Sequence, residues 1–181
     1  VADNSFAGLD IAVTHPEVDT VDIDRSELAT VVVDNQNNLQ RIFTPTIQSA
    51  ITAAGKPGSG DTIGIGPGTF DEKVTIDEAG ITLNGPNAGK PGHGDRNDEA
   101  TIKQGAVITA DSVTVDGLEV TNDDTNGILL GTTAAPSDVV VNNTVVRDIQ
   151  GGTAGSTNAV GNGINLQFND VFEDTSKNVN I

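Results

Sequence analysis

The chain has 181 residues, of which 35% are hydrophobic and 3% aromatic, and it contains no Cys, Met, Trp or Tyr. The formal charge is −17, from 26 acidic and 9 basic residues, which excludes nucleic acid and anionic lipid as favoured partners because their phosphates would be repelled. The absence of cysteine excludes disulfides and thiol chemistry, and no apolar run approaches the roughly 18 to 20 residues of a membrane span.

Residues 1–45 form an N-terminal segment with two strand-like runs, 9–13 and 28–33, joined by an acidic stretch. Long tails usually stay disordered unless something ties them down. We therefore expect an extended β segment that packs on the rest of the chain or on a neighbouring molecule.

A short helix is predicted over residues 46–54. Its apolar residues Ile47, Ala50, Ile51 and Ala54 fall on one helical face, and Thr46 is a suitable N-cap. An ordinary amphipathic helix packed on a sheet would show the same pattern. We interpret it as a cap, because the repeats that follow it would otherwise expose the end of their core.

From residue 63 onward one short pattern returns, in which two apolar residues flank a central residue. Each copy predicts a strand of about three residues whose alternate side chains point inward. The copies are residues 63–65, 74–76, 81–83, 113–115, 139–141, 164–166 and 179–181.

Three of these triplets lead directly into a pair of Asn, Asp or Gly residues, at 84–85, 116–117 and 142–143. Such residues tolerate the left-handed backbone of a tight corner, so the pairs indicate equivalent corners in successive turns of a solenoid. Residues 126–130 and 162–166 are a further pair of similar segments, which again indicates successive turns of a solenoid.

The start of this region resembles the pectin-lyase-like superfamily, in particular periplasmic copper-processing and surface β-helix proteins and pectin methylesterases. The resemblance lies in the Ile-Gln-x-Ala-Ile helix at 47–51 and in the Pro-Gly-Thr-aromatic-x-Glu turn at 67–72. It implies an all-β fold, a right-handed parallel β-helix over residues 46–181. Because the matching residues build the coil and carry no chemistry, the resemblance is specific for fold and weak for function.

The residues argue against catalysis. The paired catalytic Asp motif and the Arg-x-Trp motif of pectin methylesterases do not occur, and there is no Trp at all. The one grouping worth testing is Arg147 and Asp148, near Asp116 and Asp124 in the coil register. A salt bridge at the rim explains it equally well.

Two other sites are predicted from local sequence. Asn122, Asp123 and Asp124 are a calcium candidate, because clustered carboxylates and amides supply oxygen ligands, although a solvated turn is the simpler interpretation. Asn142 begins an Asn-x-Thr sequon and is a candidate for glycosylation. His93 lies in a Gly- and Pro-rich stretch, residues 89–99, that reads as a solvated loop without ligand spacing.

The last triplet aligns Val179 with Val139, so Ile181 lies partway through a coil. An incomplete coil would expose backbone hydrogen-bonding groups and would accept another strand. We expect the strand with Leu9, Ile11 and Val13 of a neighbouring copy to add there, which gives a head-to-tail homopolymer. The alternative is a fragment of a larger β-helix protein.

The expected function is that of a non-catalytic structural protein, a surface or filament subunit. The acidic composition, rich in Asp and poor in Lys, suits a salt-loving archaeon or bacterium. The start at Val1 indicates either a processed mature chain or a trimmed one, and the former suggests secretion. The alternative is a polysaccharide-active or sugar-binding β-helix domain. Calcium is the one candidate cofactor, and polysaccharide is the alternative partner.

Overall fold

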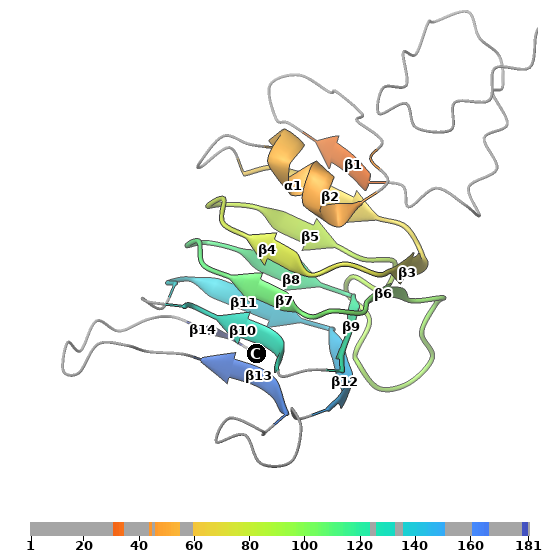
Figure 1. Cartoon of the computed structure of the whole chain (residues 1–181). Helices are drawn as coiled ribbons and strands as arrows, with labels where there is room; N and C mark the ends of the chain where they lie inside the picture. The colour runs from red at the N-terminus through yellow and green to blue at the C-terminus, as the bar shows by residue number, and fades with distance from the viewer. Residues whose placement is uncertain are drawn as a thin grey trace, which may run out of the picture.

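The computed structural model describes residues 31–34, 44, 46–54, 60–123, 126–132, 136–150, 161–166 and 179–180. Within them the chain is an all-β right-handed parallel β-helix. Its successive coils stack and form three sheets (Figure 1). Sheet I contains β1 (Val31–Asp34), β2 (Thr62–Ile65), β5 (Thr82–Asn84), β8 (Thr114–Asp116), β11 (Val139–Asn142) and β14 (Val179–Asn180). Sheet II contains β3 (Gly68–Phe70), β6 (Ala100–Ile102), β9 (Glu119–Asn122) and β12 (Val145–Ile149). Sheet III contains β4 (Val74–Ile76), β7 (Ala106–Ile108), β10 (Asn126–Leu130) and β13 (Asn162–Leu166).

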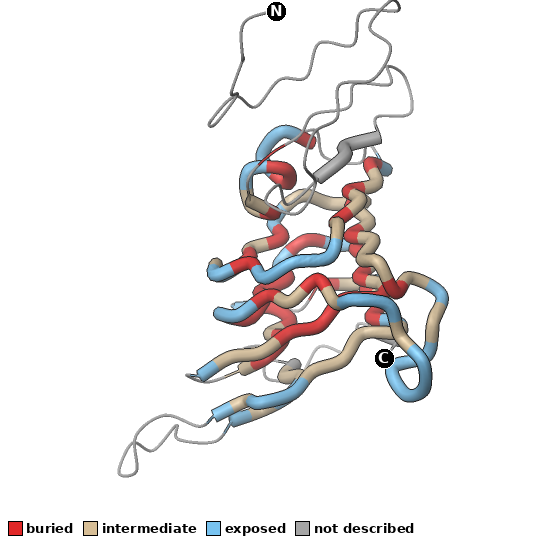
Figure 2. Tube along the Cα trace, turned by 90° about the vertical axis from the view of Figure 1, so that its right-hand side faces the viewer, coloured by how far each residue is buried: buried red, intermediate tan, exposed pale blue. Residues whose placement is uncertain are grey.

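Each coil contributes one strand to each sheet, so equivalent side chains of successive coils lie in register. In sheet I, Ile63 is paired with Leu83 and Leu83 with Val115, and all three side chains are buried. Burial of one such aliphatic side chain contributes about 1.5 to 3 kcal/mol. Figure 2 shows the buried residues along the inside of the coils, so the core is a narrow column of stacked aliphatic side chains.

The three predicted corners align in the strand register, and two of them have the predicted left-handed backbone. Asn84 pairs with Asp116, and Asp116 pairs with Asn142. The residues that follow the last two, Gly117 and Asn143, have φ values of 71° and 49°. The left-handed backbone explains why small or amide residues recur there.

The N-terminal end of the stack is covered. Helix α1 (Ile47–Ala54) lies over it with its four predicted apolar residues buried, and the Thr46 hydroxyl accepts the Ser49 backbone N–H at 3.0 Å, as predicted for the N-cap. The Glu72 carboxylate accepts the N–H groups of Ile47 at 2.8 Å and Gln48 at 3.1 Å. Strand β1, from the predicted 28–33 run, pairs antiparallel with β2 and closes the edge of sheet I.

Sheet II was not predicted as strands. The sequence predicts a turn over residues 67–72, but Gly68–Phe70 is strand β3, paired in parallel with β6. The turn interpretation failed because Pro and Gly precede a single inward aromatic residue, Phe70, which gives no visible alternation. No helix in the described part of the chain is long and apolar enough to cross a membrane.

Candidate functional site: a charged cluster beside sheet II

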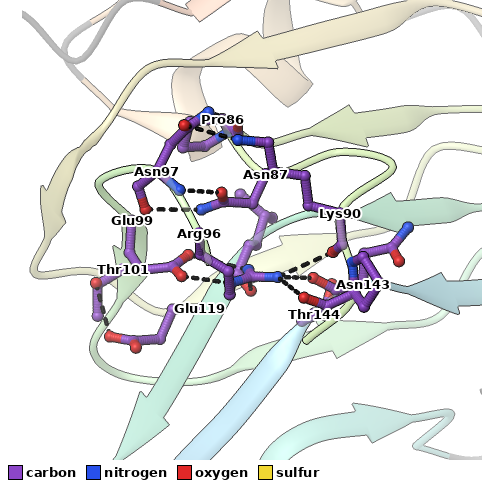
Figure 3. Close-up of polar contacts among 12 residues, drawn as sticks. Pro86, Asn87, Lys90, Arg96, Asn97, Glu99, Thr101, Glu119, Asn143 and Thr144 are labelled. Carbon is purple, nitrogen blue, oxygen red and sulfur yellow. Dashed lines mark hydrogen bonds and ion pairs between the residues drawn. The ribbon is translucent and has the colours of Figure 1, made fainter. Parts of the chain in front are cut away.

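Five charged side chains are linked by ion pairs beside sheet II and the loop of residues 85–99 that joins β5 to β6. Figure 3 shows three of them, Arg96, Glu99 and Glu119. We call the five side chains the charged cluster. Its members are Arg96, Glu99, Glu119, Arg147 and Asp148.

Glu119 is the cluster's most enclosed carboxylate, because β9 places it between two neighbouring coils. Its side chain is 8% exposed. Arg147 of β12 donates to it through Nε at 2.7 Å and Nη2 at 2.9 Å, and the Thr101 hydroxyl of β6 donates at 2.9 Å. Three coils are thus joined through one carboxylate by charge-assisted hydrogen bonds.

Arg96 joins the loop to the coils beneath it. Its side chain is 8% exposed and pairs with Glu99, at 2.5 Å from Nε and 3.1 Å from Nη2. Nη1 also donates to the carbonyl oxygen of Asn143 at 2.8 Å and to those of Lys90 and Pro91. The five-donor guanidinium suits this task, because it can serve several acceptors from one position.

Asn87 fixes the other side of the loop. It is completely buried, donates its amide to the Asn97 carbonyl oxygen at 3.1 Å and accepts the Asn97 N–H at 2.6 Å. The loop lies directly against the corner, since a Cβ atom at Gly117 would stand 1.9 Å from the Ala88 nitrogen. The expectation of a solvated loop over residues 89–99 holds for Pro91 to Asp95, which are exposed, and is wrong for Arg96, whose side chain is 8% exposed.

The electrostatics favour the charged form of the Glu99 carboxyl. The hydrogen bond from Arg96 lowers the pKa of the Glu99 carboxyl, which burial alone would raise. The hydrogen bonds to Glu119 raise the pKa of Arg147, which also pairs with Asp148. A general acid needs a carboxyl whose pKa is raised, so Glu99 is poorly suited to donate a proton at neutral pH. Chemically the arrangement is suited to clamping coils together.

Of the grouping proposed for catalysis, the structure describes Arg147, Asp148 and Asp116. Arg147 pairs with Asp148 and Glu119, which matches the rim salt bridge. Asp116 instead accepts the Gly89 N–H at 3.2 Å and the Asn143 amide at 2.8 Å. Asp124 lies outside the described residues.

The calcium candidate is only partly described. Asn122 donates its amide to the Asn126 carbonyl oxygen at 2.6 Å, and Asp123 is exposed. In the described part of the chain, no three His, Asp or Glu side chains are arranged to hold a metal. Calcium binding there stays a prediction, and Asp124 lies outside the description.

Asn142 stands at the exposed end of β11, with its carbonyl oxygen accepting the Thr144 hydroxyl at 2.8 Å. Its glycosylation stays a prediction. Of the assembly residues, Val179 is paired with Val139 as the alignment predicts. Leu9, Ile11, Val13 and Ile181 lie outside the described residues.

One buried acid stands apart from the cluster. Asp61, just before β2, is completely buried, and among the described contacts neither of its carboxylate oxygens has a hydrogen-bond partner. A calcium site needs several oxygen ligands, and a lone carboxylate does not supply them. We assign it no ligand.

Sequence reasoning missed Glu119, Arg96 and Asn87. Glu119 follows Leu118 and precedes Val120, both buried, so its outward position was readable from the alternation. Arg96 and Asn87 had no such signal, because they lie in an irregular loop and bond mainly to other residues of that loop, Arg96 to Glu99 and Asn87 to Asn97. No family model, no curated protein sequence and no solved structure significantly matches the chain.

Proposed function

We propose that this chain is a non-catalytic extracellular structural protein, a surface or filament subunit that assembles by strand addition at the C-terminal edge of its β-helix. The observation that supports this most directly is the difference between the two ends of the stack. At the N-terminal end, β1 pairs with β2, α1 covers the core, and the Gln48 amide bonds to the Thr75 backbone.

At the other end, β12, β13 and β14 are each paired on one side only within the described residues. Such an edge offers unpaired backbone N–H and C=O groups to a further strand. We propose that the strand with Leu9, Ile11 and Val13 of a neighbouring copy adds at this end, where Val179 and Ile181 lie in the sequence. Because donor and acceptor surfaces differ, the contact is head-to-tail and extends into a polymer.

The charges fit a structural role in strong salt. The net charge of −17 keeps separate molecules apart in dilute buffer, and salt shortens the range of that repulsion. We therefore propose secretion to the surface of a halophilic cell, with assembly favoured by salt. Membership of the pectin-lyase-like superfamily is part of the proposal and rests on the motifs at 47–51 and 67–72.

The charged cluster supports the non-catalytic assignment. Arg96 and Arg147 are its cations, and each of its three carboxylates is paired with one of them. Reaction with a saccharide would need a carboxyl group free to exchange a proton.

Sugar binding is the second candidate, and it rests on a different observation. The amides of Asn162 and Asn165 both donate to the side-chain oxygen of Asn126, at 3.3 Å and 3.1 Å, which makes a row of amides along sheet III. Amides at fixed spacing can bind sugar hydroxyls.

The experiment is light scattering on residues 1–181 in dilute and in concentrated NaCl, repeated without residues 1–20. We expect salt-induced assembly that the deletion abolishes. Replacing Leu9, Ile11 and Val13 by Ser should abolish it too, whereas Ser at the alternate positions Ala12 and Thr14 should preserve it. Monodisperse particles in every sample, together with retention on a neutral polysaccharide resin, would favour sugar binding instead.

A further inference from the structure

Three strands of sheet III share a local pattern, in which an amide residue and a glycine precede an apolar position. The pattern begins at Gln104-Gly105, Asn126-Gly127 and Asn162-Gly163. The strand register confirms that they are equivalent, because Ile128 pairs with Ala106 on one side and with Ile164 on the other.

The next coil explains the first two glycines. A Cβ atom at Gly105 would stand 2.7 Å from the Asn126 carbonyl oxygen, and one at Gly127 would stand 2.6 Å from the Gly163 carbonyl oxygen. Real Cβ atoms do not approach backbone so closely, so the glycine lets the following coil pack. Gly105 also has a φ of 74°, whereas the φ of Gly127 is not positive, so space alone requires a glycine at 127.

Gly163 occupies the equivalent position in β13, but no described atom comes close enough to require a glycine there. It is exposed, its φ is not positive, and the nearest atom of any described residue to its Cβ position is Val146 Cγ1 at 3.8 Å. Its neighbour Ile164 is only partly buried, although Ile128 of the coil before is completely buried. Gly163 and Ile164 thus have the residue types of an interior coil, although no described strand lies on the far side of β13.

We propose that a strand from a second copy of this chain packs on β13 in parallel register, with its backbone against Gly163. This rests on the proposed function and specifies its edge and register. The occupant is residues 8–11, which read Gly-Leu-Asp-Ile, whereas residues 163–166 read Gly-Ile-Asn-Leu. Glycine, aliphatic, polar and aliphatic residues follow in the same order, so Leu9 covers Ile164.

The edge of sheet II is less suited to this role. The register of β12 shifts between Val146 and Ile149, where a bulge carries the exposed, charged residues Arg147 and Asp148. Bulges and charges at an edge disfavour strand addition. The pairing of β13 with β10 shows no such interruption. We therefore place the added strand on the edge of sheet III.

Cysteine cross-linking tests the register, because the chain has no cysteine of its own. Neighbouring strands lie about 4.8 Å apart, within the Cα separations that a disulfide spans. Asp10→Cys in one sample and Asn165→Cys in another should form an intermolecular disulfide when mixed under mild oxidation in concentrated salt. Asn162→Cys, displaced along the strand by about 10 Å, should cross-link with Asp10→Cys at least about tenfold less.

The outcomes separate the two proposals. Polymers that form with no preference for Asn165→Cys would overturn this register and leave the assembly intact. If neither polymer nor disulfide forms, both proposals fail. A disulfide within one molecule of the double variant at high dilution would show that the segment folds back on its own chain, which contradicts the second copy.

A substitution at the glycine gives an independent readout. Gly163→Val should leave the melting temperature of the unassembled chain unchanged and abolish polymer formation. Gly92→Val is the matched control, since Gly92 is also exposed and its Cβ position is 3.7 Å from the nearest described atom. Polymerisation by Gly163→Val at the same rate as by Gly92→Val would contradict the proposal.

Discussion

The side-chain amide of Gln48 bonds to the backbone of Thr75 as a neighbouring strand would. Its oxygen accepts the Thr75 N–H at 2.7 Å, and its nitrogen donates to the Thr75 carbonyl oxygen at 3.1 Å. Helix α1 therefore both covers the apolar core and completes the hydrogen bonding of sheet III at its N-terminal edge.

Removal of this amide should destabilise the fold. In Gln48→Ala the two backbone groups of Thr75 lose their partner, which costs about 1 to 3 kcal/mol if they stay shielded from water. Circular dichroism during urea unfolding measures the change, because the chain lacks Trp and Tyr. The control is Thr52→Ala, an exposed position on the same helix. Equal stability of the two variants would contradict the strand-like role of Gln48.

Replacing Arg96 should loosen the charged cluster. Arg96→Ala leaves Glu99 without its guanidinium partner, and breaking a buried pair costs about 3 kcal/mol. Arg96→Lys should recover only part of this, because an ammonium group cannot match the planar fork. Lys103→Ala removes one positive charge at an exposed site and controls for net charge. A loss in Lys103→Ala as large as that in Arg96→Ala would show that net charge, and not the clamp, is responsible.

The Glu99 carboxyl should make stability depend on pH in acid. Its pKa is lowered in the folded chain, chiefly by the hydrogen bond from Arg96. A lowered pKa contributes stability above the unfolded value, about 4.3, and the contribution disappears as the pH falls through the folded value. The difference in unfolding free energy between the wild type and Glu99→Gln should therefore be constant near neutral pH and shrink below about pH 4. When both chains also carry Arg96→Ala, the pH dependence of this difference should largely vanish. If the pH dependence persists, a group other than the Arg96–Glu99 pair causes it.

Two equivalent glycines should respond differently to the same substitution. Gly127→Ala places a Cβ atom 2.4 Å from Val146 Cγ1 and 2.6 Å from the Gly163 carbonyl oxygen, which should cost about 1 to 3 kcal/mol through overpacking. Gly163→Ala meets no described atom nearer than 3.8 Å and should change the unassembled chain little. Thermal unfolding of both variants in dilute buffer measures the difference. A similar loss in both would mean that Gly163 is already covered within the single chain.

The sequence predicts sheet I well and sheet II poorly. Strands such as β11 alternate Val139 and Val141 inward and end in a corner pair, so both periodicity and turn chemistry mark them. In sheet II, β3 has a single inward residue, Phe70, and β12 carries the exposed charged residues Arg147 and Asp148. Strand β6 does alternate, with Ala100 and Ile102 buried, so its pattern was readable.

The charged cluster could not be predicted from the order of residues along the chain. Arg147 follows β11 and meets Glu119 from the preceding coil, and their distance depends on coil stacking. The loop at 89–99 is predicted from the sequence, but the contacts of Asn87 with Asn97 are not, because they arise within an irregular segment. Glycine and proline content indicates exposure over 89–99, which holds for residues 91–95 and fails for Arg96.

Electron microscopy and diffraction of the polymer formed in concentrated salt by residues 1–181 test the central claim most directly. If the β-helices stack end to end through added strands, the strands lie across the filament, and a reflection near about 4.8 Å should run along its axis. Filaments without that axial repeat, or filaments that still form after deletion of residues 1–20, would contradict assembly by strand addition.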